Sequence, residues 1–189
     1  GVIGMHPSLT TPPPSIGFPP NASLLVLGQV PDTDVSLAGS QWAWEIGGCK
    51  DGTLPTFDLQ QAVRTSQFVA ESVQKQQLLA IHDIAEGGLA VAAAEMAIDS
   101  GFGAQIVDHC DHISMFNESG GRFLAVVGDE LLDDFLKDAK RHDVPAIQIG
   151  RTGGTSLNFG TEIIIPVSEL ETAYRTELPE ALGLGNVNT

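Results

Sequence analysis

The sequence predicts a layered α+β domain built around a mixed β-sheet. Short apolar runs alternate with stretches of helical periodicity along most of the chain, which predicts strands joined by crossover helices. Some predicted strands follow one another without a helix between them, so neighbouring strands can also pair as hairpins. The chain has 189 residues, of which 42% are apolar, and this is enough for one compact core.

The first residues differ in composition from the rest. Six of the fourteen residues from 7 to 20 are proline, which favours an extended, solvated segment over a helix or a central strand. We therefore expect an extended proline-rich leading segment over residues 1–22, a domain over residues 23–184 and a short tail over residues 185–189. The chain begins at Gly1 without Met, which suggests the interior of a longer polypeptide.

The domain is expected to open with a strand, a long loop and a helix. Residues 23–30 form a short apolar run between Asn and Pro, typical of a buried strand. Residues 31–55 are rich in turn formers, and a loop of this length in a compact domain is often functional. A helix is expected to begin near Asp58, because Asp58 and Gln61 resemble a capping box. Its expected buried face consists of Leu59, Ala62, Val63, Ser66, Val69, Ala70 and Val73.

A second strand and helix follow. Residues 78–83 predict the strand, Gly87 and Gly88 the turn after it, and Gly101 the end of the helix. The expected buried stripe of this helix is Leu89, Ala92, Ala93 and Met96. Residues 103–107 and 122–128 predict two further strands.

The last part of the domain is expected to hold two helices and two strands. The first helix is expected to be capped by Asp129 and to bury Leu131, Leu132, Phe135, Leu136 and Ala139. Residues 145–154 and 161–167 predict strands, and the glycine-rich residues 150–160 are interpreted as a hairpin turn because they lack the lysine and following helix of a P-loop. Residues 168–183 predict a closing helix with Ser168 and Glu171 as a capping box.

Charge and cysteine content exclude several classes of function. The formal net charge is −15 and only nine Lys and Arg are present, which argues against a surface for nucleic acid or anionic membrane. No apolar run reaches the length that a bilayer needs, so we expect a cytoplasmic protein. The two cysteines lack zinc or disulfide spacing and fit reduced thiols. The run from His109 to His112 is interpreted as a loop, with a transition-metal site as the alternative.

Two short stretches carry residues that could perform chemistry. Asp83 follows a strand and precedes a glycine turn, so it is either a helix cap or a ligand of a hard cation such as Mg²⁺. Alternation along the strand directs His82 to the opposite face. Glu118, Ser119 and Arg122 surround two glycines, and this pattern suits either an anion site or a tight turn with a surface arginine. Trp42 and Trp44 line a pocket or simply pack on the core.

Residues 81–106, IHDIAEGGLAVAAAEMAIDSGFGAQI, resemble the C-terminal domain of the aminoimidazole ribonucleotide synthetase superfamily. Members of this superfamily share a His-Asp-x-x-x-Gly-Gly-Leu signature at a strand-to-helix turn. Within it, the chain is most similar to the phosphoribosylformylglycinamidine synthases. The stretches that carry this similarity are GVIG at residues 1–4, LAGSQ at 37–41, NESGGRF at 117–123, IGRTGG at 149–154 and ELETAYRTELPEAL at 169–182.

The resemblance implies a three-layer α/β/α fold and a role in an ATP-dependent C–N ligase of de novo purine biosynthesis. Such an enzyme converts formylglycinamide ribonucleotide, ATP and glutamine-derived ammonia to formylglycinamidine ribonucleotide, and phosphoryl transfer of this kind needs Mg²⁺. By resemblance, Asp83 binds Mg²⁺, and the positions that contact nucleotide or substrate are Ala85 through its backbone, Gly87, Gly88, Glu118, Ser119 and Arg122. Asn117 replaces the first serine of the pattern, which puts substrate contact by this copy in question.

The resemblance also implies that this chain is one part of a larger assembly. The catalytic histidine and most ATP-binding residues are expected in N-terminal domains of the same enzyme, so the ATP or ADP site is shared and the isolated domain is inactive. A separate glutaminase subunit and a small accessory subunit are expected if the enzyme is the unfused form. The alternatives are a non-catalytic assembly or regulatory module that binds a partner through the Trp42 to Trp44 loop, and a domain of another ATP-dependent synthetase of the superfamily.

Overall fold

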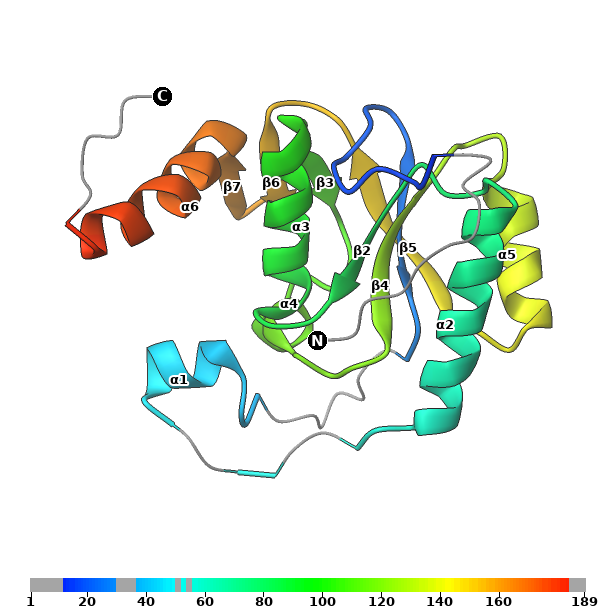
Figure 1. The fold of residues 1–189 in the computed structure, drawn as a ribbon, viewed down its shortest axis with the longest axis horizontal. Helices are drawn as coiled ribbons and strands as arrows, with labels where there is room; N and C mark the ends of the chain where they lie inside the picture. The colour runs from blue at the N-terminus through cyan, green and yellow to red at the C-terminus, as the bar shows by residue number, and fades with distance from the viewer. Residues whose placement is uncertain (1–11, 30–36, 50–51, 54–55, 184–189) are drawn as a thin grey trace.

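The sheet has the mixed topology that the sequence predicts. The computed structural model describes residues 12–29, 37–49, 52–53 and 56–183, so the GVIG motif at residues 1–4 and the tail at residues 185–189 lie outside the described part. Seven described strands form one sheet in the order β2-β4-β1-β5-β3-β6-β7 (Figure 1). Paired strands run antiparallel, except β3 and β6, which are parallel. The strands are β1 (Ser23–Leu27), β2 (Ala80–Ile84), β3 (Ala104–Ile106), β4 (Arg122–Val127), β5 (Ala146–Thr152), β6 (Ser156–Phe159) and β7 (Ile163–Pro166).

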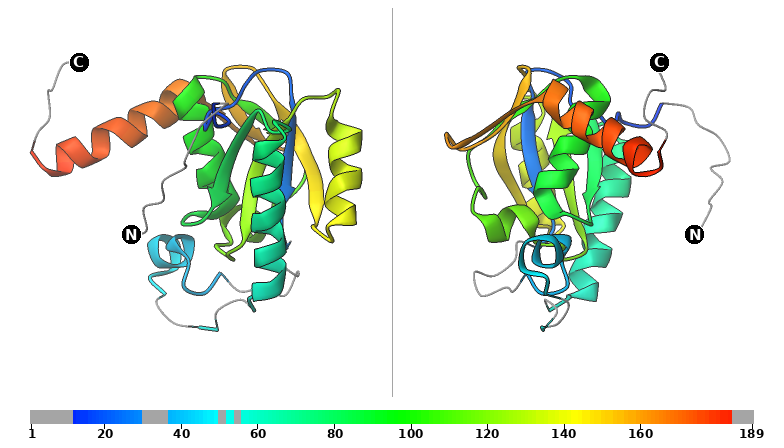
Figure 2. Two further views of the ribbon diagram at one scale, coloured as in Figure 1. Left: turned by 45° about the vertical axis from the view of Figure 1, so that its right-hand side comes forward. Right: turned by 90° about the vertical axis from the view of Figure 1, so that its left-hand side faces the viewer.

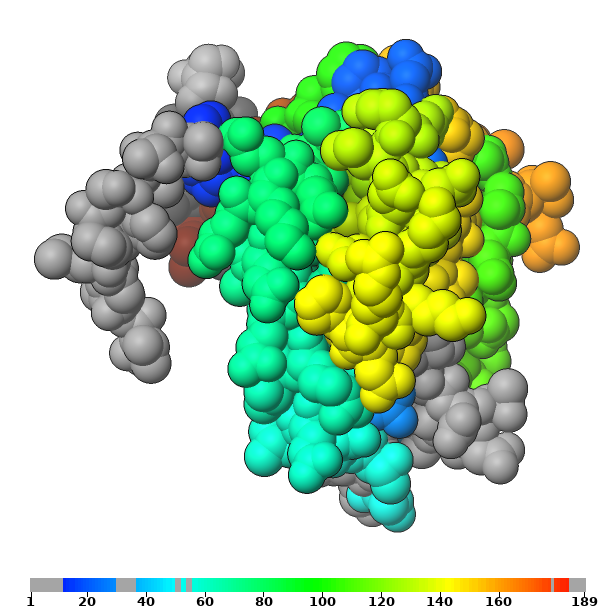
Figure 3. Space-filling model, turned by 90° about the vertical axis from the view of Figure 1, so that its right-hand side faces the viewer, coloured from blue at the N-terminus to red at the C-terminus, as the bar shows by residue number. Residues whose placement is uncertain are grey.

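Helices cover both faces of the sheet, which confirms the three-layer α/β/α arrangement. The helices α2 (Leu59–Gln74) and α5 (Leu132–Arg141) lie side by side over one face (Figure 3). The helices α3 (Gly88–Ser100) and α4 (His112–Phe116) pack on the other face. The short helix α1 (Gln41–Gly47) lies beyond one end of the sheet, and α6 (Val167–Ala181) extends away from the body (Figure 2).

Two apolar cores lie on the two sides of the sheet, and β1 divides between them. Leu24 and Val26 face the α3 side, whereas Leu25 and Leu27 face the α2 and α5 side, as the period of two in a strand requires. Each apolar side chain buried in this way stabilises the fold by about 1.5–3 kcal/mol. The predicted stripe of α3 is confirmed, because all four of its members are buried, namely Leu89, Ala92, Ala93 and Met96. Gly101 ends α3 in the left-handed conformation, with φ +75°.

The buried face predicted for α2 is only partly correct, since Val69 and Val73 pack against the core but the first turns of the predicted face do not. Leu59 and Val63 are 65% and 46% exposed, and the buried residues of the helix are Thr65, Phe68 and Ser72. The ring of Phe68 lies 5.3 Å from that of Phe135 on α5, so this aromatic pair sets which side of α2 faces the sheet. Two small polar residues occupy buried positions, and their polarity hid the correct face from the apolar pattern.

The glycine-rich residues 150–160 are not a hairpin turn between neighbouring strands. β5 continues to Thr152 and β6 begins at Ser156, but β3 lies between them in the sheet. This insertion needs close backbone contact, since a Cβ on Gly150 would lie 2.1 Å from the carbonyl oxygen of Gln105. The hairpin that the sequence anticipates exists instead between β6 and β7.

The predicted helix starts are confirmed in one case and wrong in two. Asp58 caps α2 by accepting a hydrogen bond from the backbone N–H of Gln61 at 3.0 Å. Asp129 does not cap α5, which follows Leu131, because its carboxylate binds Ser23 and Arg151. Ser168 lies inside α6, which begins one residue earlier at Val167.

Two short helices were not predicted, and the leading segment joins the body. α1 occupies part of the expected 31–55 loop, and α4 begins at His112 with Asp111 as its cap. Ser15 forms a parallel bridge with Ala80 at the edge of β2, and Phe18 is buried in the core on the α3 side. Among the described helices, none has both the length and the apolar character needed to cross a bilayer.

Candidate functional site

The end of β2 and the turn that follows it place Asp83 in solvent. Ile84 is buried on the α3 side of the sheet, and His82 lies on the same side, with Nε2 3.4 Å from Oε2 of Glu95 on α3. The side chain of Asp83, between them in the strand, is 67% exposed. Its backbone carbonyl lies 2.7 Å from Nδ1 of His82. The carboxylate of Asp83 is therefore accessible from outside the chain, although its Oδ1 lies 3.6 Å from Nδ1 of His82.

The backbone conformation and the contacts within the protein explain both glycines of the turn between β2 and α3. Gly87 and Gly88 adopt φ values of +75° and +68°, which side-chain-bearing residues rarely adopt. A Cβ on Gly88 would lie 2.6 Å from the carbonyl oxygen of Met115 and 2.8 Å from that of Asn117. The N–H of Gly88 donates to the carbonyl of Ala85, itself an exposed residue. The turn is thus shaped by the close approach of α3 to the end of α4.

Glu118 contacts the protein itself at the position where the sequence suggests a ligand contact. Its Oε1 accepts hydrogen bonds from the backbone N–H of Gly87 and from that of Gln41, each at 2.8 Å. One donor precedes α3 and the other is the first residue of α1. The carboxylate therefore joins two segments that lie far apart in the sequence.

Arg122 is turned inward in the same loop. It is only 4% exposed and donates to the backbone carbonyls of Ser119 and Asn117 and to Oδ1 of Asn117. Burial lowers the pKa of the Arg122 guanidinium to about 10, and no carboxylate in the described ranges forms an ion pair with it. The N–H of Ser119 donates to Oδ1 of Asn117 at 2.9 Å. This network organises the loop that carries Glu118.

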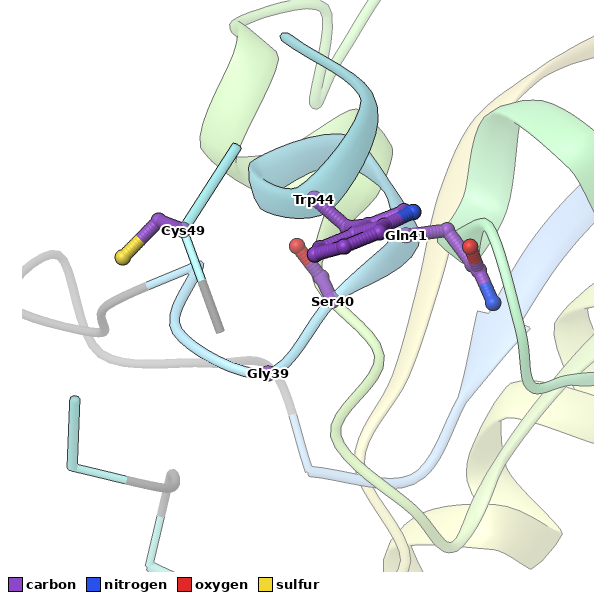
Figure 4. Close-up of a pocket in the computed structure, with 5 residues that line it drawn as sticks. All are labelled: Gly39, Ser40, Gln41, Trp44 and Cys49. Atoms are coloured by element: carbon purple, nitrogen blue, oxygen red, sulfur yellow. The ribbon is translucent and has the colours of Figure 1, made fainter. Parts of the chain in front are cut away.

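A pocket of about 360 Å³ lies at α1, and three of its lining residues belong to the stretch LAGSQ that the family resemblance singled out (Figure 4). It is lined by Gly39, Ser40, Gln41, Trp44 and Cys49. Ser40 caps α1, since its Oγ accepts from the N–H of Ala43. Trp42 does not line the pocket, because its ring packs 5.5 Å from His112 and 6.3 Å from Phe116 on α4. Sequence reasoning named the two tryptophans but missed that they face different environments.

The described residues supply no complete metal site of their own. No group of three or more His, Cys, Asp or Glu side chains in this part of the chain is arranged to hold a metal ion. In the run from His109 to His112, Asp111 is used as the cap of α4 and Cys110 forms no disulfide. A single exposed carboxylate such as that of Asp83 has the chemistry of one ligand in a nucleotide-bound Mg²⁺ site, whose other ligands are usually phosphate oxygens and water.

The mixed sheet, with helices on both faces and a glycine turn after β2, defines an α+β domain of the three-layer α/β/α class. The chain belongs to the family of AIR synthase related proteins, C-terminal domain, whose family model matches residues 22–160. Curated relatives include the phosphoribosylformylglycinamidine synthase subunit PurL of Parafrankia sp. (strain EAN1pec), 34% identical over 98% of this chain, and that of Nocardioides sp. (strain ATCC BAA-499 / JS614), 32% identical over 96%. The chain spans about a quarter, 24%, of the length of each.

Solved structures agree on the fold. Thermotoga maritima PurL complexed with FGAR has a TM-score of 0.65 and 16% identity, and the similarity covers 84% of this chain and 29% of that one. A hydrogenase maturation protein, HypE, has a TM-score of 0.51 and 16% identity over 78% of this chain and 49% of its own. Because PurL and HypE share this fold under different names, the fold alone does not fix the reaction.

Proposed function

We propose that this chain is a C-terminal domain of an ATP-dependent phosphoribosylformylglycinamidine synthase. The observation that carries the proposal is the similarity of nearly the whole chain, at 34% identity, to a curated synthase subunit. The proposed reaction converts formylglycinamide ribonucleotide to formylglycinamidine ribonucleotide with ATP and ammonia from glutamine. A cytoplasmic location and cooperation with glutaminase and small accessory subunits belong to the same proposal. The solved PurLQS structure of T. maritima, similar in fold, supports the idea of such an assembly.

The residues of this chain support a contribution to a shared site. Asp83 offers an exposed carboxylate, whereas Gly87, Gly88, Glu118 and Arg122 already bond within the protein. We therefore place ligand contact at Asp83, at the backbone around Ala85 and at Ser119. The remaining domains of the enzyme supply the other walls. Solved PurL structures with ATP and ADP are similar in fold, which supports a nucleotide at such a site.

We propose that the carboxylate of Asp83 binds Mg²⁺ only when nucleotide is present. When bound, the ion neutralises charge on the transferred phosphoryl group. The carboxylate of Asp83 at the end of β2 is 67% exposed, with Oδ1 3.6 Å from Nδ1 of His82, and the same ring nitrogen lies 2.7 Å from the backbone carbonyl of Asp83. On this basis the isolated chain has too few ligands to retain the ion or the nucleotide. Titration calorimetry of the chain with MgATP should show no tight, stoichiometric binding.

The decisive experiment replaces the matching quarter of the Parafrankia subunit with this chain. The chimera, supplied with ATP, Mg²⁺ and ammonium, should form formylglycinamidine ribonucleotide. Asp83→Asn in the chimera should raise the Mg²⁺ concentration needed for half-maximal rate by about tenfold or more, because one carboxylate ligand is lost. Glu86→Gln, a neighbouring exposed carboxylate, is the matched control and should leave that concentration unchanged. A folded chimera without activity would contradict the proposed function.

A further inference from the structure

The carboxylate of Glu118 bridges two backbone donors from separate parts of the fold. Oε1 receives the N–H of Gly87, at the turn before α3, and the N–H of Gln41, at the start of α1. We propose that Glu118 is a positioning residue that fastens α1, and with it the pocket at Gly39 to Trp44, to the glycine turn beside Asp83. This inference deepens the proposed function and rests on it for its catalytic meaning.

The attachment of α1 to the body gives the bridge its importance. α1 has seven residues, and Ala43 is its one buried residue. An isolated helix of this length has no stability of its own in water, so contacts must hold it in place. The ring of Trp42 supplies one contact by packing against α4. Glu118 supplies a second one through the backbone N–H of the neighbouring Gln41, at the N-terminal end where backbone donors lack partners within the helix.

Glu118 also occupies a position that suits an anion. A left-handed glycine before a helix points its N–H outward, and the helix dipole favours negative charge there. In this chain the protein's own carboxylate takes that place at 2.8 Å. A carboxylate that accepts two backbone N–H groups forms charge-assisted hydrogen bonds, which are stronger than neutral ones. The glycine turn therefore serves as an anchor for α1, and its Gly87 donor is already in use.

The loop that holds Glu118 is itself fixed from beneath. Arg122 donates to the carbonyls on both sides of Glu118, those of Asn117 and Ser119. Its burial, at 4% exposure, keeps the loop from adopting other conformations without losing these bonds. Arg122 thus fixes the position of Glu118, and Glu118 fixes the position of α1. The pattern NESGGRF is explained as a positioning device inside the domain.

Amide hydrogen exchange tests the bridge directly. The variant pair is Glu118→Gln, which keeps an acceptor oxygen, and Glu118→Met, which keeps the length of the side chain but accepts nothing comparable. The amides of Gln41 and Gly87 should be protected in the unaltered chain and in Glu118→Gln. In Glu118→Met they should exchange at least about tenfold faster, because both hydrogen bonds are gone. Equal exchange in the two variants, or unprotected amides in the unaltered chain, would overturn the proposal.

Tryptophan fluorescence gives a second readout, because both tryptophans of the chain, Trp42 and Trp44, belong to α1. Acrylamide quenching should increase in Glu118→Met and stay near the unaltered value in Glu118→Gln, while the far-ultraviolet circular dichroism of the sheet is retained. If Glu118→Met does not fold, protection of the two amides in the unaltered chain still decides the matter. In the chimera, Glu118→Met should raise KM for the ribonucleotide more than Glu118→Gln does. An inactive unaltered chimera would remove the proposed function but leave the exchange result standing.

Discussion

Replacing Gly88 with alanine tests whether the glycine turn is shaped by packing inside the protein. Gly88 has φ +68°, and a Cβ there would lie 2.6 to 2.9 Å from three backbone atoms of residues 115–117. Gly101 is a matched control, because its φ is +75° and a Cβ would meet nothing within 4 Å. The two substitutions share the backbone strain and differ only in the crowding.

The expected magnitudes follow from this difference. Gly101→Ala should lower the free energy of unfolding by about 1 kcal/mol, the cost of a left-handed conformation for a residue with a Cβ. Gly88→Ala should lose a further 1–3 kcal/mol, roughly, because backbone atoms cannot move aside as a flexible side chain can. Urea unfolding followed by circular dichroism measures both values. If the two variants lose the same stability, α3 does not depend on close approach to α4, and the internal explanation of the glycine pair is refuted.

Two further predictions concern stability. Ser72 is fully buried on α2 and its Oγ has no hydrogen-bond partner in the described structure, so Ser72→Ala should stabilise the protein by about 1 kcal/mol in urea unfolding, whereas exposed Ser66→Ala should change it by only a few tenths. The hydrogen bonds from Arg151, and to a smaller extent the one from Ser23, lower the pKa of Asp129. The contribution of Asp129 to the free energy of unfolding is therefore present above the ordinary aspartate pKa and is lost as pH falls through the lowered pKa. Asp129→Asn should therefore be less stable than the unaltered chain at pH 7, and thermal unfolding should show this gap closing toward pH 3; a constant gap would contradict the assignment.

The sheet was predictable where local sequence and burial agree. β1 is an interior strand between β4 and β5, and every residue of β1 is buried, so an apolar run identifies it without knowledge of its neighbours. The pairing of β3 between β5 and β6 was not predictable, because β3 has three residues and its position depends on glycines that allow backbone contact. The prediction of the buried face of α2 was only partly correct for a related reason. Phe68 packs against Phe135, far away in the sequence, and this contact outweighs the local apolar pattern of Leu59 and Val63.

In the candidate site, too, the residue types could be identified from the sequence, but the contacts that each residue makes could not. A carboxylate, two glycines and an arginine in one loop suit an anion-binding site, and they suit a self-contained loop equally well. The difference lies in what each group faces after folding. Asp83 at the end of β2 faces solvent, whereas Glu118 faces Gln41 and Gly87. No spacing rule joins residues 41, 87 and 118, because they meet only when α1 folds back beside the turn. A family pattern can thus mark residues that contact a ligand and residues that hold those contacts in place, and only three-dimensional bonding separates the two.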